Sequence, residues 1–62
     1  MCRVLILDDN FFYAETIQLI LQGEDEAHPD VATQAQEAID KVAQAASRNK
    51  PYEILLIDHR LG

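Results

Sequence analysis

The sequence has few of the features that usually stabilise very small proteins. Its 62 residues include a single cysteine, Cys2, so no disulfide can form within the chain. No second metal-ligand residue stands near Cys2 at the spacing of a structural zinc site. A chain of this length buries only about 60 % of the surface that its unfolded form exposes. We therefore expect one small domain, and self-association is one of the few remaining ways to stabilise it.

Basic residues and long apolar runs are also scarce. Five basic residues against eleven acidic ones give a formal net charge of -6, which opposes binding to nucleic-acid phosphates and to anionic membrane surfaces. The longest aliphatic runs, at residues 4–7 and 54–57, are far shorter than the roughly 20 residues of a membrane span. The first residues also lack the pattern of a signal peptide. We expect no nucleic-acid or membrane partner and, with no disulfide, a cytoplasmic location.

The apolar residues that are present predict three strands. Residues 3–8 and 53–58 contain continuous aliphatic runs that end in aspartate, a pattern typical of parallel strands buried on both faces. A shorter and more polar segment at 30–33 predicts a strand at the edge of the sheet.

Two stretches between these strands have helical spacing of apolar residues. They predict helices at about 11–22 and 34–48. Asn10 or Asp9 can cap the start of the first helix, and Gly23 marks its end. The first helix is apolar over much of its circumference, so it needs cover on more than one side.

The expected order is therefore β-α-β-α-β, an α/β fold with a parallel sheet. Right-handed crossovers place the first strand in the middle, in the order 2-1-3, with the helices on opposite faces. The third strand then lies at an edge although its composition is that of an interior strand. Pairing with a second copy would resolve this conflict and give a homodimer. The candidate interface residues are Ile54, Leu55, Leu56 and Ile57, with Phe12 and Ile20 of the first helix.

Three acidic residues follow the two strands that we expect to be neighbours. Asp8 and Asp9 follow the first strand, and Asp58 follows the third. Ligands of open parallel sheets gather at the carboxyl ends of the strands, near the point where the strand order reverses. Like charges so close together repel unless a cation lies among them, and oxygen ligands suit Mg²⁺. Each aspartate alone is an ordinary cap or turn residue, but the three together favour a functional site.

The segments that carry these acids resemble the receiver domains of two-component response regulators. The matching segments are residues 4–10 (VLILDDN) and 54–62 (ILLIDHRLG), with Ile17, Leu21 and Gly23 between them. The resemblance covers the whole chain but only the first half of the family's domain. It implies half of a flavodoxin-like doubly wound sheet.

The resemblance also implies a role for each acid. Asp58 is similar to the aspartate that accepts a phosphoryl group, and Asp8 and Asp9 look like the pair that binds Mg²⁺. Asp58 and the backbone carbonyl of Arg60 would complete the metal contacts. The phosphoryl donor would be a sensor histidine kinase or a phosphotransfer protein, so the chain would be a signalling domain and not an enzyme.

One feature of the family is not found in these 62 residues. Receiver domains also use a hydroxyl residue after a fourth strand and a lysine after a fifth, and neither strand lies in this sequence. The resemblance therefore implies that phosphoryl transfer is impaired. The alternative is a self-assembling interaction unit without catalytic activity, in which the acidic site is idle.

Overall fold

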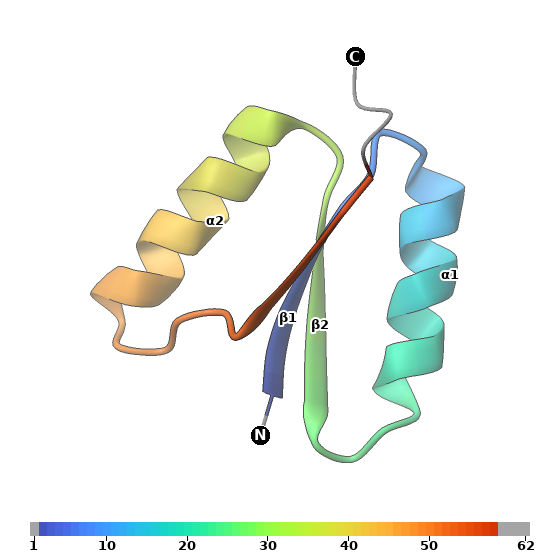
Figure 1. Ribbon diagram of the computed structural model, residues 1–62, viewed down its shortest axis with the longest axis horizontal. Helices are drawn as coiled ribbons and strands as arrows, with labels where there is room; N and C mark the ends of the chain where they lie inside the picture. Colours follow the sequence, from blue (N-terminus) through green and yellow to red (C-terminus); the bar gives the residue numbers. More distant parts are fainter. Residues whose placement is uncertain (1, 59–62) are drawn as a thin grey trace.

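The chain folds into a three-stranded sheet with one helix on each face (Figure 1). The computed structural model describes residues 2–58. The elements are β1 (Cys2–Leu7), α1 (Phe11–Gln22), β2 (Ala27–Ala32), α2 (Ala35–Ser47) and β3 (Ile54–Ile57). All strands are parallel, in the order β2-β1-β3. The predicted fold class and strand order are therefore confirmed.

Strand β1 forms the centre of the core because both of its faces are covered. Val4 and Ile6 pack beneath α1, where Ala14 has no exposed surface. Leu5 and Leu7 point to the opposite face and pack beneath α2. The buried residues of both helices are small alanines, which lets the helices pack closely on the sheet. The continuous aliphatic run that predicted a fully buried strand has that position in the structure.

Both helices lie within one residue of their predicted bounds, and backbone bonds close their ends. Gly23 follows α1 as expected, but with a right-handed conformation (φ -71°). After α2, Asn49 has a left-handed conformation (φ 60°). The N–H of Asn49 donates to Ala46 O and that of Lys50 donates to Ala45 O, which is a Schellman motif. Within residues 2–58, neither helix is long and apolar enough to cross a membrane.

Strand β2 differs most from its predicted bounds. We expected residues 30–33, but β2 begins three residues earlier and pairs with β1 over its full length. Pro29 lies inside it without disrupting the pairing, because alternate residues of a strand bond to opposite sides. Pro29 O accepts a bond from Gln18 Nε2 at 3.0 Å, and Val31 O accepts one from Lys41 Nζ at 2.6 Å. The backbone groups of the odd-numbered residues of β2 therefore face the free edge of the sheet. The missing N–H of Pro29 costs no hydrogen bond to β1.

Strand β3 is the least covered element of the sheet. It pairs with β1 alone, and the two helices pack on β1 and β2. All four of its side chains are exposed, from 41 % for Leu56 to 59 % for Ile57. The predicted conflict between an interior composition and an edge position is present in the structure.

A cluster of polar side chains joins the three chain segments at the other end of the sheet. Tyr52 Oη, just before β3, donates to Asp30 Oδ2 of β2 at 2.6 Å. Arg3 of β1 lies 3.7 Å from the same oxygen, and its guanidinium is 4.9 Å from the centroid of the Tyr52 ring. Arg3 also donates to the carbonyl oxygen of Lys50. The pKa of Tyr52 is raised to about 12, mainly by burial of the phenol and secondly by its hydrogen bond to the Asp30 carboxylate.

The raised pKa of Tyr52 predicts a loss of stability at high pH. The folded state holds the phenol proton of Tyr52 more tightly than the unfolded state does. Tyr52 therefore contributes its full stabilisation below pH 10, and this stabilisation is lost as the pH rises toward 12. We expect the free energy of unfolding in urea to fall over this range, and to fall less steeply in Tyr52→Phe. Tyr13→Phe, which removes the other phenol, should follow the wild type. An unchanged slope in Tyr52→Phe would contradict this account.

Candidate functional site

Three carboxylates lie together where β1 and β3 end. Asp8 and Asp9 directly follow β1, and Asp58 directly follows β3. The two strands are parallel neighbours, with Leu7 beside Ile57, so their carboxyl ends meet. One carboxylate oxygen from each aspartate lies within 4.8 Å of the other two. The structure therefore brings together the three acids that the sequence predicted to converge.

Backbone bonds to neighbouring strands hold two of these residues in place. The N–H of Asp8 donates to Ala32 O of β2 at 3.1 Å, and that of Asp58 donates to Leu7 O of β1 at 2.9 Å. The three residues differ in exposure. Asp8 is 6 % exposed, Asp58 is half-buried and Asp9 is exposed. The cluster thus has a buried base and an accessible side.

The start of α1 lies directly beside the cluster. Asp8 Oδ1 accepts the N–H of Asn10 at 2.8 Å, which forms an Asx turn. Asn10 Oδ1 in turn accepts the N–H groups of Phe12 at 3.0 Å and Tyr13 at 3.3 Å. Asn10 is therefore the N-cap, one of the two residues that the sequence offered. The partial positive charge of a helix N-terminus favours negative charge nearby.

The donor atoms of the cluster suit a hard cation. All three ligands are carboxylate oxygens, the type that Mg²⁺ and Ca²⁺ prefer. At a bond length of about 2.0–2.1 Å, opposite ligands of Mg²⁺ are roughly 4.2 Å apart. The oxygens lie within 4.8 Å of one another, so small side-chain movements or one intervening water would allow all three to share an ion. A divalent cation would also relieve the repulsion among the three charges.

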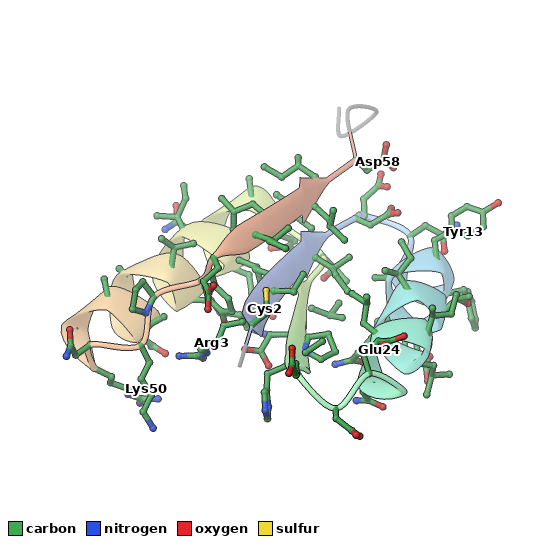
Figure 2. All side chains as sticks on the ribbon, turned by 60° about the horizontal axis from the view of Figure 1, so that its bottom comes forward. Cys2, Arg3, Tyr13, Glu24, Lys50 and Asp58 are labelled. Atoms are coloured by element: carbon green, nitrogen blue, oxygen red, sulfur yellow. The ribbon has the colours of Figure 1, made fainter. Side chains whose placement is uncertain are left out.

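Arg3, Lys41 and Lys50, among the basic residues that the structure describes, make their contacts away from the acidic cluster. Figure 2 shows Asp58 at one end of the sheet, and Arg3 and Lys50 at the opposite end. Arg3 binds Asp30 and the Lys50 carbonyl, while Lys41 bonds to β2 and lies 3.8 Å from Glu37. Within residues 2–58, the described contacts of these cations are therefore remote from the three aspartates.

Three further residues that the sequence suggested for the metal site or for a dimer interface, Arg60, Phe12 and Ile20, are not part of the described carboxylate cluster. Arg60, whose carbonyl was expected to contact the metal, lies outside the described residues. Phe12 and Ile20 are 78 % and 68 % exposed on α1. The bond between Asp8 and Asn10 was not predicted from the sequence, although an aspartate two residues before an N-cap is a recognisable turn signal.

The N-cap predicts a measurable contribution to stability. Asn10→Ala removes the acceptor of two helix N–H groups and should lower the free energy of unfolding by about 1 kcal/mol. Asn10→Ser keeps a capping oxygen and should remain near the wild type. Urea unfolding followed by circular dichroism measures both variants. Equal losses in the two variants would show that the capping bond is not the cause.

No protein-family model matches the chain, and comparison with curated proteins and with solved structures gives no significant match.

Proposed function

We propose that Asp8, Asp9 and Asp58 bind a divalent cation, with Mg²⁺ the expected ion, and that Asp58 accepts a phosphoryl group in two-component signalling. The observation that carries this proposal is the approach of three carboxylate oxygens to within 4.8 Å at the ends of two neighbouring parallel strands. This is the position at which ligands of open parallel sheets bind. The receiver-like motifs around these three residues point to the same chemistry.

The accessible side of the cluster suits the transfer step. An oxygen of the half-buried Asp58 carboxylate would attack the phosphorus of a donor in line with the bond that breaks. The P–N bond of a phosphohistidine, or the P–O bond of an acyl phosphate, breaks with its electron pair on the donor, and an aspartyl phosphate forms. Asp8 and Asp9 would hold the cation. A bound Mg²⁺ supplies positive charge against the phosphoryl oxygens.

The donor in this proposal is a sensor histidine kinase or a phosphotransfer protein in the cytoplasm. Asp9 is exposed beside Asp58, so a donor can approach the cluster from the carboxyl ends of the strands. Arg3 and Lys50 lie at the opposite end of the sheet, and Lys41 bonds to Val31 O and lies near Glu37, so none of these three supplies positive charge beside the phosphoryl group. We therefore expect slow transfer from small donors.

The alternative is an interaction unit in which the acidic site is idle. The observation that favours it is the exposure of the apolar side chains of β3, all of them at 41 % or more. The two functions make different predictions, because only the first depends on the carboxylates.

The first test is cation binding. A cation that binds only the folded chain raises its stability, by about 2.7 kcal/mol at 100 times the dissociation constant. We expect Mg²⁺ to raise the melting temperature, and Asp9→Asn to reduce that increase. Asp25→Asn is the matched control, because it removes one exposed charge from the loop between α1 and β2. Equal responses in the two variants would mean that Mg²⁺ acts only as a counterion.

The second test is transfer itself. Incubation with Mg²⁺ and acetyl phosphate should add one phosphoryl group, slowly, as measured by intact-mass spectrometry. Asp58→Asn should abolish the adduct, whereas Asp40→Asn on the exposed face of α2 should retain it. An adduct that persists in Asp58→Asn, or none in the wild type, would contradict the assignment of Asp58.

A further inference from the structure

The two edges of the sheet differ in how their backbone groups are covered. At the β2 edge, Pro29 has no N–H, and the side chains of Gln18 and Lys41 donate to outward-facing carbonyls. Proline and covering side chains are common ways to block edge pairing. At the β3 edge, none of the side-chain hydrogen bonds described for residues 2–58 reaches the backbone of Ile54–Ile57. Within the described residues, therefore, the β3 edge is open to another strand and the β2 edge is not.

The open edge is apolar on both faces. Because parallel partners in register point to the same face, Ile54 and Leu56 lie on the α1 side with Val4 and Ile6. Leu55 and Ile57 lie on the α2 side. There they line a groove of about 420 Å³ with residues of β1 and α2. Neither face of β3 carries a charged side chain within Ile54–Ile57.

Both helices extend this apolar surface toward β3. Lys41 fixes one flank of α2 to β2, and the opposite flank brings Ile39 and Val42 into the groove with Leu55 and Ile57. Gln18 fixes one flank of α1 to β2 in the same way. At 100° per residue, the opposite flank of α1 carries Ile20. Phe12 instead lies on the side of α1 that faces away from Ala14 and the sheet.

The backbone of β3 determines how a second strand can pair with it. The N–H of Asp58 donates to Leu7 O, so even-numbered residues of β3 bond toward β1. Since backbone groups alternate along a strand, Leu55 and Ile57 present theirs to the open edge. An added antiparallel strand can therefore bond only to these two residues within Ile54–Ile57.

We propose that the chain forms a two-fold homodimer in which β3 pairs antiparallel with β3 of a second copy. In the register that uses all outward groups, Leu55 of each copy lies opposite Ile57 of the other, and the two Leu56 residues meet at the two-fold axis. Every pair on the α2 side is then apolar, and four backbone hydrogen bonds close the edge. The result is a continuous six-stranded sheet in the order 2-1-3-3-1-2.

The distribution of charge favours the antiparallel arrangement. The acidic cluster lies at the carboxyl end of β3, and Arg3 and Lys50 lie at the other end (Figure 2). Antiparallel pairing separates the two acidic clusters and brings each toward the basic end of the partner. A parallel pair would place six carboxylates at one end, which like-charge repulsion opposes.

The dimer does not require the proposed function, because its four backbone hydrogen bonds involve neither a carboxylate nor a cation. Sedimentation equilibrium on the 62-residue chain should give twice the 7.0 kDa chain mass. Leu55→Lys should weaken the dimer about tenfold or more, because it places two charges in the paired region. Leu19→Lys is the matched control: Leu19 is also more than half exposed, but on α1 away from β3, so the dimer should persist.

A cysteine cross-link tests the register. In a Cys2→Ser background, Leu56→Cys places two thiols at a non-hydrogen-bonded pair, where Cα atoms about 4.5 Å apart suit a disulfide. We expect mild oxidation to give a covalent dimer with Leu56→Cys and much less with Leu55→Cys. Circular dichroism checks that each variant is folded.

Three results would overturn the proposal. A wild-type chain that sediments as a folded monomer excludes the dimer. Dimerisation that survives Leu55→Lys places the interface elsewhere, and a higher yield of cross-link from Leu55→Cys than from Leu56→Cys excludes the register. None of these measurements depends on Mg²⁺ or on phosphoryl transfer, so a failure here and a failure of the proposed function can be told apart.

Discussion

The burial of β1 between two helices and two parallel neighbours is the constraint on which the rest of the structure depends. Every other element packs against β1, whereas β2 and β3 have no contact with each other. Leu5 and Ile6 are the largest fully buried side chains, one on each face. A strand in this position needs apolar residues without alternation. Because both crossovers are right-handed, their helices lie on opposite faces of the sheet only if β2 and β3 lie on opposite sides of β1.

The same arrangement concentrates negative charge at one point. A sheet with β1 in the middle brings the end of β3 beside the end of β1, and aspartates follow both strands. Asp8 is 6 % exposed and shares this point with two further carboxylates, which opposes folding through like-charge repulsion. The adjacent helix N-terminus and the bond from Asn10 offset part of that repulsion. Functional sites typically keep charged groups in arrangements that lower the stability of the domain.

Most of the fold could be predicted from the sequence because its strongest patterns are local. The aliphatic runs at 4–7 and 54–57 specify β1 and β3, and crossover handedness then fixes the order of the strands. The start of β2 could not be predicted, since Pro29 is compatible with a strand only at an edge where its missing N–H is not needed. The bonds from Gln18 and Lys41 that cover this edge depend on how the helices lie over the sheet. Sequence spacing does not carry that information.

For the site, the sequence predicted which acids converge but not how they are held. The order of the strands brings Asp8 and Asp58 together whatever the local conformation. Their different burial follows from backbone bonds to β2 and β1, which become visible only once the register of the sheet is known. The exposure of Phe12 likewise depends on which face of α1 meets the sheet, and a helix that is apolar over much of its circumference leaves that choice open.

The position of Asp58 links the two proposals through one short strand. Strand β3 has four residues and a single partner strand, and Asp58 follows its last residue. Pairing on the open edge would restrict the motion of β3, so less conformational entropy would be lost when Asp58 joins a shared cation. A cation held by Asp8 and Asp58 would in turn tie the end of β3 to β1 and reduce fraying of the strand that pairs. Linkage requires the two effects to be equal, so if both proposals hold, dimerisation and cation binding would each strengthen the other.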